Sequence, residues 1–323
     1  MTATATTTTT TVIRLGTRRS ALAMAQAQLV ADALRAHGAQ VELVGVTTEG
    51  DRSARVGAPL SEAGGVGVFV TELRAQLVRG GVDLVVHSLK DLPTGDADGL
   101  TIAAIPRRED PRDALISRER LSHLQLPIGA SVGTGSPRRA AQLLAVRPDL
   151  DVRPVRGNVD TRIGKVSTGE FDAVVVAAAG LARLGRTNEA SEIFGPDVMV
   201  PAPGQGALAI ECRAADDAID GRLARLVQLL DDFPTRAAVV AERTVLAGLE
   251  AGCTAPVGAL ALPLDDPSGS LNLHLVAVVV SVDGATAIRR SATGPATEAH
   301  ELGRRLTVDL LTAGAADVVG VRS

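Results

Sequence analysis

A stretch with unusual chemistry spans residues 82–93, which read VDLVVHSLKDLP. An apolar run typical of a buried parallel strand ends in Lys90 and Asp91, and Pro93 closes it. An aspartate in such a turn often only hydrogen-bonds the nearby backbone. A carboxylate fixed among cationic groups can instead accept an N–H donor or stabilise a cation formed during a reaction. Both interpretations of Asp91 stay open on the local sequence, whereas His87 is expected to be a packed residue and not a general base.

Arginines recur where helices disfavour positive charge. A helix N-terminus carries a partial positive charge, so a cation there costs about 0.3–1 kcal/mol. Three expected N-termini, each after an expected strand, carry arginines: Arg18 and Arg19, Arg138 and Arg139, and Arg156 and Arg162. The carboxyl ends of strands in open α/β sheets line the ligand site. The arrangement therefore predicts a site for a polyanion whose carboxylates arginine grips bidentately.

The segment GTGSPR, residues 133–138, offers a backbone nest for the same kind of ligand. It is not a dinucleotide-binding fingerprint, because Arg138 stands where the third glycine belongs.

The two cysteines, Cys212 and Cys253, have no metal-ligand spacing around them and cannot form a disulfide framework. Cys212 falls in an expected strand, ALAIEC, and is expected to be inert. Cys253 follows Gly252 at an expected helix end and precedes Thr-Ala-Pro, which predicts an exposed turn. A nucleophile or attachment point and a bystander are both open for Cys253.

Strands and helices alternate in the first part of the chain, which favours an α/β domain. Ser20 is the expected N-cap of the first helix and His37-Gly38 its expected stop. The polar, glycine-rich residues 47–67 are expected to form a surface loop or lid. The expected strands are 12–16, 41–46 and 82–88, and the expected helices are 21–38 and 68–81.

This pattern then recurs. Residues 130–148 repeat the strand, turn, Arg-Arg and helix of residues 16–30, and residues 169–184 repeat residues 80–93. The simplest account is two domains of like topology, the first enlarged by the lid loop.

The pattern changes beyond PAPGQGALAIECR. Thr235 is expected to cap a helix, and three alternating segments follow at 256–264, 271–284 and 285–294 before a last helix near Ala296. The sequence therefore predicts a small third α+β domain that carries Cys253.

The composition limits the function classes. The 33 Lys and Arg residues and 37 Asp and Glu residues give a net charge of −4, so nucleic acid and membranes are poor bulk partners. The only aromatic residues are four Phe, which removes the stacking platforms of a single-strand binder. Residues 1–11, MTATATTTTTT, lack the features of a signal peptide and are expected to be a frayed tail of a cytoplasmic protein.

Six motifs in order, HSLKDLP, GTRRSALA, GTGSPRRAAQL, VRGNVDTR, PAPGQGALAIECR and AGCTAPVGA, together resemble the porphobilinogen deaminase (hydroxymethylbilane synthase) family. The resemblance runs from about residue 12 to residue 260. It implies two α/β domains of periplasmic-binding-protein type around a cleft, with a third domain that carries the cofactor cysteine. The implied boundaries are 12–106 with a returning segment 204–225 for domain 1, 107–203 for domain 2 and 233–323 for domain 3.

The resemblance also implies the chemistry. Cys253 would hold a dipyrromethane cofactor through a thioether, and four porphobilinogen units would be added with loss of ammonia before hydrolysis releases hydroxymethylbilane. Asp91 would be the catalytic carboxylate that stabilises the cation formed as ammonia leaves, with Lys90 and Arg18 near the reacting ring. The implied cofactor- and substrate-chain positions are Ser20, Thr134, Ser136, Arg138, Arg139, Arg156, Arg162, Arg183 and Gln205. No metal is implied, the protein is expected to be a monomer, and the product is expected to pass to uroporphyrinogen-III synthase.

Two positions depart from the family pattern. Glu62 and Val66 stand where the lid segment often has lysines, so Arg52 or Arg55 is expected to substitute. Pro137 replaces an aliphatic residue at a position where proline suits the first turn of a helix.

Two rival classes remain. Two like α/β domains around an anion site also describe a non-catalytic solute receptor, which would need neither Asp91 nor Cys253. A transcriptional effector domain is the second rival, but no basic helix-turn-helix segment precedes these domains.

Overall fold

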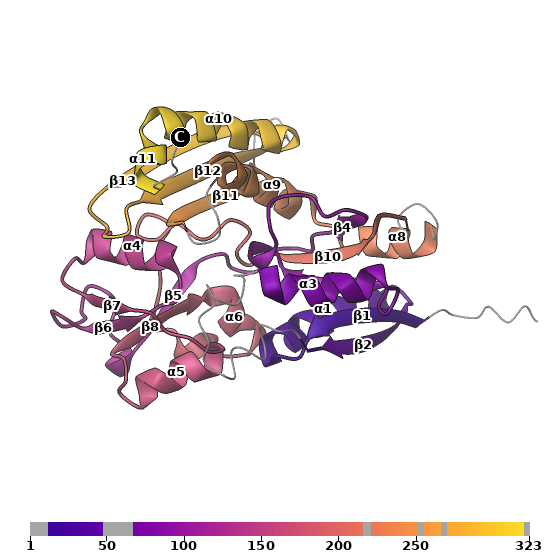
Figure 1. Ribbon diagram of the computed structural model, residues 1–323, viewed down its shortest axis with the longest axis horizontal. Helices are drawn as coiled ribbons and strands as arrows, with labels where there is room; N and C mark the ends of the chain where they lie inside the picture. The colour runs from indigo at the N-terminus through magenta and orange to yellow at the C-terminus, as the bar shows by residue number, and fades with distance from the viewer. Residues whose placement is uncertain (1–11, 48–66, 216–220, 251–254, 266–269, 320–323) are drawn as a thin grey trace, which may run out of the picture.

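The computed structural model describes residues 12–47, 67–215, 221–250, 255–265 and 270–319, and these residues form three sheets. Two sheets lie side by side in the lower part of Figure 1, and the third lies above both of them. No helix in these ranges is long and apolar enough to cross a bilayer. Four predictions from the sequence concern residues outside these ranges: the tail, most of the lid loop with Glu62 and Val66, the substitutes Arg52 and Arg55, and Cys253.

The first sheet has the order β2-β1-β3-β10-β4. β1 pairs in parallel with β2 and β3, and β10 runs antiparallel to β3 and β4. The helices α1 and α8 pack on one face of this sheet and α3 on the other. Its elements are β1 Val12–Arg18, α1 Ala21–Ala36, β2 Gln40–Val46, α3 Gly67–Val78, β3 Leu84–Ser88, β4 Leu100–Ala104, β10 Leu208–Arg213 and α8 Gly221–Gln228.

The predicted ends of the first helix are confirmed. Ser20 is the N-cap of α1, and its side chain accepts a hydrogen bond from Ala23 N. His37 is the C-cap, and Gly38 follows at φ 80°, a left-handed conformation that glycine adopts without strain.

The second sheet has the order β7-β6-β8-β5-β9. β6 pairs in parallel with β7 and β8, and β5 runs antiparallel to β8. This is the arrangement of the first sheet again, so the prediction of two domains with like topology is confirmed. The elements are β5 Asp113–Ser117, β6 Ser131–Gly133, α4 Pro137–Val146, β7 Asp151–Arg153, α5 Val159–Ser167, β8 Ala173–Ala177, α6 Ala178–Arg183 and β9 Glu192–Ile193.

The third sheet, β11-β12-β13, is antiparallel, and α9 and α10 pack on one face of it, as predicted for an α+β domain. One prediction was wrong here, because Thr235 does not cap α9. Asp232 is the N-cap, and its carboxylate accepts the Thr235 N–H at 3.0 Å; an aspartate is favoured there by the helix dipole. The elements are α9 Phe233–Gly248, β11 Val257–Asp265, β12 Leu271–Val280, β13 Ala287–Pro295, α10 Ala299–Thr312 and α11 Ala315–Val319. Short 3-10 turns are η1 Leu89–Asp91, η2 Arg118–Arg120, η3 Thr187–Glu189 and η4 Ala296–Glu298.

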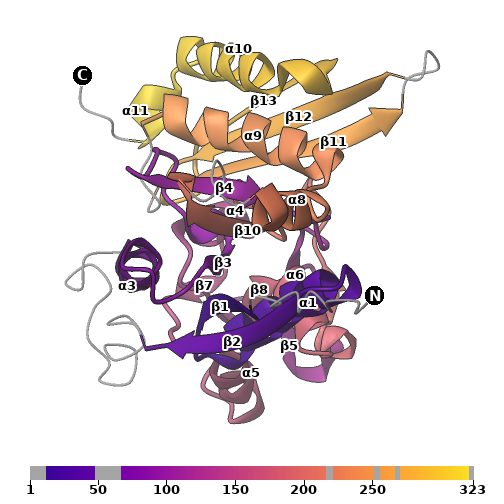
Figure 2. The same cartoon turned by 90° about the vertical axis from the view of Figure 1, so that its right-hand side faces the viewer.

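The C-terminal layer docks on both other parts of the molecule. α9 lies over β4 and β10 in both views (Figures 1 and 2). On the other side, Leu260, Val278 and Val280 form a buried cluster with Ala141 of α4 and Val200. The third layer therefore fixes the distance between the first two sheets.

Gly284, in the turn between β12 and β13, contacts α4 so closely that a side chain would not fit. It has φ 77°, and a Cβ there would lie 2.6 Å from Ala145 N and 2.8 Å from Leu144 Cβ. Gly314 has φ 91°, but the nearest atom to its Cβ position is Ile288 Cδ1 at 4.0 Å.

We predict that Gly284→Ala lowers the melting temperature more than Gly314→Ala does. Both substitutions pay the left-handed backbone cost of about 1–2 kcal/mol, but only the first also separates the turn from α4. Differential scanning fluorimetry on both variants measures the difference. Equal shifts would contradict a close contact at Gly284.

Candidate active site

The helix N-termini of the two α/β parts meet. Gly180 lies near the start of α6 and packs closely against the other two helices. A Cβ at this position would lie 3.8 Å from the side chain of Leu22 of α1 and 3.8 Å from that of Val159 of α5. These helices follow or begin at the carboxyl ends of strands, so the ends of both sheets face one another. That is the arrangement expected from the positions of the arginines.

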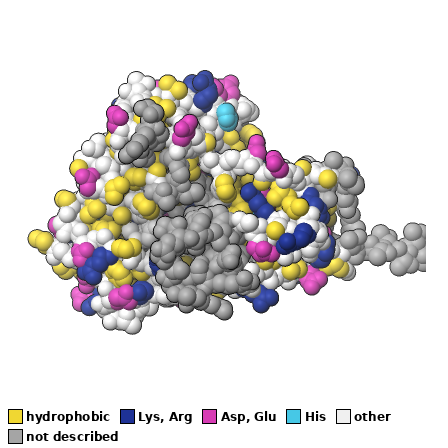
Figure 3. Space-filling model, in the orientation of Figure 1, with side chains coloured by type: hydrophobic (Ala, Val, Ile, Leu, Met, Phe, Trp, Pro, Cys, Tyr) yellow, Lys and Arg dark blue, Asp and Glu magenta, His cyan; other side chains and the backbone are white. Residues whose placement is uncertain are grey.

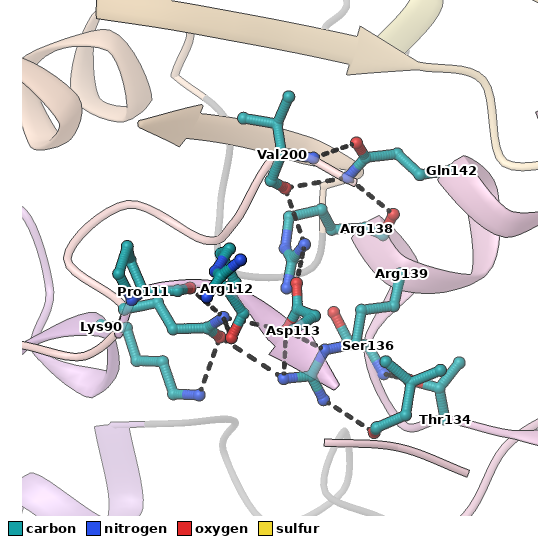
Figure 4. Close-up of polar contacts among 12 residues, drawn as sticks. Lys90, Pro111, Arg112, Asp113, Thr134, Ser136, Arg138, Arg139, Gln142 and Val200 are labelled. Carbon is teal, nitrogen blue, oxygen red and sulfur yellow. Dashed lines mark hydrogen bonds and ion pairs between the residues drawn. The ribbon is translucent and has the colours of Figure 1, made fainter. Parts of the chain in front are cut away.

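At this junction two arginines share one buried carboxylate (Figure 4). Arg138 NH1 lies 2.8 Å from Asp113 Oδ2, and Arg139 Nε lies 2.9 Å from Asp113 Oδ1. All three side chains are buried. Burial by itself would raise the pKa of Asp113, but the two guanidinium groups hold that pKa well below its ordinary value. The carboxylate is therefore ionised at neutral pH.

Gln205 joins this group to Lys90. Its Nε2 donates to Asp113 Oδ1 at 2.8 Å and to the carbonyl of Pro111 at 2.7 Å. Its Oε1 accepts from Lys90 Nζ at 3.2 Å and from Arg139 NH2 at 3.4 Å. Side chains from the η1 turn, the segment before β10, β5 and α4 thus form one hydrogen-bonded set.

Positive charge exceeds negative charge around this set. Burial, and next the charge of Arg139, lower the pKa of Lys90 to about 8. The same two causes lower the pKa of Arg162 to about 10. Burial also lowers the pKa of Arg183, which donates to the Gly206 carbonyl at 2.6 Å. A bound anion would relieve these unfavourable charges, so the electrostatics favour an anionic ligand.

Asp91 lies beside Lys90 at the end of η1, half-buried. Its carboxylate makes no hydrogen bond with the residues that the structure describes, although its charge helps keep Lys90 protonated. Free acceptor positions next to a cationic site are what a group needs to bind an N–H donor or stabilise a cation.

The other predicted site residues lie at strand ends or in the turns that lead into the following helices. Arg18 ends β1 half-buried, and Ser20 caps α1. Thr134 is buried and its Oγ1 accepts from Ser136 N at 3.2 Å, in the turn that leads into α4 with Pro137 at the first helical position. Arg156 is exposed just before α5.

Sequence reasoning missed three buried carboxylates. Asp113 holds Arg138 and Arg139, so these arginines already have a protein partner. Glu211 on β10 accepts a bidentate bond from Arg74 of α3 and lies 3.2 Å from His87 Nε2, which confirms His87 as a packed residue. Glu242 of α9 pairs with Arg108. A lone acid inside an apolar run, as in PRDALIS or ALAIEC, was the signal available in the sequence.

The residues present fit a group that carries several carboxylates. Lys90, Arg162 and Arg183 carry charge that no carboxylate within hydrogen-bonding distance neutralises among the described residues. On the face shown in Figure 3, by contrast, acidic and basic side chains are interspersed.

The comparisons with known proteins agree with this geometry. Residues 13–221 match the family model described as "Porphobilinogen deaminase, dipyromethane cofactor binding domain", and residues 236–312 match its C-terminal domain. The chain is 60% identical to a porphobilinogen deaminase of Acidothermus cellulolyticus over 94% of this chain and 90% of that one. It is 53% identical to porphobilinogen deaminase 1 of Streptomyces coelicolor over 96% and 98%.

Solved structures give a weaker likeness. A periplasmic substrate-binding protein of an ABC transporter from Coxiella burnetii is 16% identical, with a TM-score of 0.43 over 72% of this chain and 96% of that one.

The fold and the junction define a two-sheet α/β protein with an anion site and a C-terminal α+β layer. With the family matches, the chain belongs to the porphobilinogen deaminase family, whose members are enzymes of tetrapyrrole synthesis that carry a dipyrromethane cofactor.

We predict that Asp113→Asn lowers the urea midpoint far more than Asp110→Asn. The first change leaves two buried guanidinium groups without a counter-charge, which costs about 3–5 kcal/mol. Asp110 also pairs with an arginine, Arg112, but that pair is partly exposed and is expected to contribute about 1 kcal/mol or less. Equal midpoints for the two variants would contradict a central structural role for Asp113.

Proposed function

We propose that this protein condenses four porphobilinogen molecules, with loss of ammonia, onto a dipyrromethane held by Cys253 and then releases hydroxymethylbilane by hydrolysis. The observation that carries the proposal is Asp91, a carboxylate with free acceptor positions beside a junction that has excess buried positive charge. The substrate needs both features, since it carries acidic side arms and passes through a cation when ammonia leaves.

The bound dipyrromethane supplies the nucleophilic pyrrole carbon onto which the chain grows. The protein's own groups have two tasks. Arg162, Arg183 and Lys90 bind the carboxylates of the cofactor and of the growing chain, because they are largely buried and no described carboxylate is hydrogen-bonded to them. The full set proposed for this role is Ser20, Thr134, Ser136, Arg138, Arg139, Arg156, Arg162, Arg183 and Gln205.

Asp91 acts at the reacting ring. Its carboxylate accepts the pyrrole N–H and stabilises the positive charge that spreads over the ring as the C–N bond to ammonia breaks. Lys90 and Arg18 bind the acidic side arms of the same ring and so orient it against Asp91. An ionised carboxylate is needed for this task, since a neutral amide of the same shape provides no opposing charge.

The proposal also covers the domain boundaries of the chain. Domain 1 comprises residues 12–106 and 204–225, domain 2 comprises 107–203 and domain 3 comprises 233–323; the place of β10 in the first sheet supports the returning segment. The chain crosses between the two α/β domains near residues 106–111 and 200–204, and these crossing segments lie together, since Glu109 N donates to the Gly206 carbonyl at 3.2 Å. The protein is proposed to act as a cytoplasmic monomer that passes its product to uroporphyrinogen-III synthase.

We predict that Asp91→Asn retains its fold and its covalent cofactor but loses nearly all porphobilinogen turnover. The amide keeps the shape of the side chain and removes its charge. Asp96→Asn, an exposed acid five positions further on, is the matched control and keeps parental turnover. Turnover is measured as hydroxymethylbilane formed, after oxidation to porphyrin, and melting temperature verifies the fold. Near-parental activity of Asp91→Asn would remove Asp91 from the mechanism, and a parent that binds porphobilinogen without consuming it would favour the receptor class.

A second prediction concerns pH. Lys90 is protonated below its pKa of about 8 and neutral above it, so its attraction for carboxylates is present at pH 7 and lost towards pH 9. KM for porphobilinogen is therefore expected to rise over this interval in the parent. Lys90→Arg keeps its charge throughout and is expected to show a smaller rise. Parallel profiles for the two proteins would show that Lys90 does not bind the substrate as a cation.

A further inference from the structure

We define the η1 turn as residues 89–93, which are η1 and the two residues after it. One arginine of α9 holds this turn from the C-terminal layer. Arg243 NH1 donates to the carbonyls of Leu89 at 3.3 Å and Leu92 at 3.0 Å. Arg243 NH2 donates to the carbonyl of Pro93 at 2.6 Å. One of these carbonyls precedes Lys90 and Asp91 in the chain, and the other two follow them. A single planar guanidinium group therefore holds the backbone on both sides of Lys90 and Asp91.

The neighbouring residue on α9 holds the crossing segments. The buried Glu242 carboxylate accepts from Arg108 NH1 at 2.6 Å and NH2 at 3.0 Å. It also accepts from Gly204 N at 2.7 Å and from Ala261 N at 2.8 Å. Two consecutive residues of one helix therefore fix the turn and the crossing segments relative to the third sheet.

The turn has few other restraints of this kind. Within the turn, Leu92 N donates to the Leu89 carbonyl at 3.1 Å, and Leu89 N donates to the Ala207 carbonyl at 3.0 Å. Both of these bonds involve Leu89, at the start of the turn. Leu92 also packs in a buried cluster that includes Val239 of α9, but among the described hydrogen bonds it is Arg243 that joins Leu92 and Pro93 to the C-terminal layer.

We propose that Arg243 is a positioning residue for Asp91: it fixes the backbone of the η1 turn from α9 and acts on the reaction through that turn without contacting substrate. The proposal rests on the proposed function. A carboxylate that must oppose a developing charge on a ring loses much of its effect when it moves by about 1 Å. Removing Arg243 is therefore expected to lower the rate of the chemical step more than the affinity for substrate.

Arg236 provides a matched control on the same helix. Its guanidinium donates to Asp231 at 2.8 Å and to the Ala103 carbonyl at 3.2 Å, so it also ties α9 to backbone carbonyls of the first α/β part. Those carbonyls belong to β4, away from the η1 turn. Loss of Arg236 weakens docking of α9 without releasing the turn.

The experiment compares Arg243→Ala and Arg236→Ala in the cofactor-loaded protein. We expect Arg243→Ala to lower kcat about tenfold or more with KM changed less than about twofold, and to speed amide hydrogen exchange in residues 88–94. Arg236→Ala is expected to change neither quantity. Intact mass verifies that both variants carry the same cofactor as the parent. Should Arg243→Ala not fold, Arg243→Lys serves, because one ammonium group keeps the charge but cannot span three carbonyls.

An unchanged kcat in Arg243→Ala, an equal loss in Arg236→Ala, or unchanged exchange in residues 88–94 would each overturn the proposal. Failure of the proposed function is distinguishable from these outcomes. It would appear as absent turnover in the parent itself, whereas the exchange comparison still measures whether Arg243 holds the turn.

Discussion

The guanidinium groups of Arg138 and Arg139 share the carboxylate of Asp113 at the junction of the sheets. This carboxylate neutralises only one of the two positive charges. Asp113 is fully buried and lies within 2.9 Å of both Arg138 and Arg139, while Lys90 approaches through Gln205. With Asp91, which lies beside Lys90, three cations and two anions give 3 − 2 = +1 for these five groups. A buried ion pair contributes little to net stability, but an arrangement with unpaired charge prepares the site for an anion before the anion arrives. The acidic overall composition of the chain does not oppose this, because the excess is local.

The same junction explains the third layer. A site built from two separate sheets holds its geometry only if something fixes the sheets relative to one another. Glu242 and Arg243 of α9 do this from one helix, the first on the crossing segments and the second on the turn that carries Asp91. In the sequence, α9 ends five positions before Cys253 (253 − 248 = 5).

Features decided by neighbours in sequence could be predicted, and features decided by distant partners could not. The Ser20 cap, the Gly38 stop and the strand of VDLVVHS depend on local capping and apolar runs, and the structure has them. Asp113 was missed because its partners are 25, 26 and 92 positions away. Arg243 was missed because its acceptors lie 150 to 154 positions away and are backbone carbonyls, which every sequence has. Thr235 was misassigned as a cap because Asp232, three positions earlier, is the better acceptor for a helix N-terminus.

The central claim is that the excess positive charge at the junction serves a polyanion bound covalently through Cys253. Intact mass of the purified protein beside that of Cys253→Ala tests it most directly, with Cys212→Ala as the matched control because that thiol is buried in β10. The account predicts an excess equal to two linked pyrrole units in the parent and in Cys212→Ala, and none in Cys253→Ala. A parent at its bare polypeptide mass that stays unmodified after incubation with porphobilinogen or hydroxymethylbilane would contradict it.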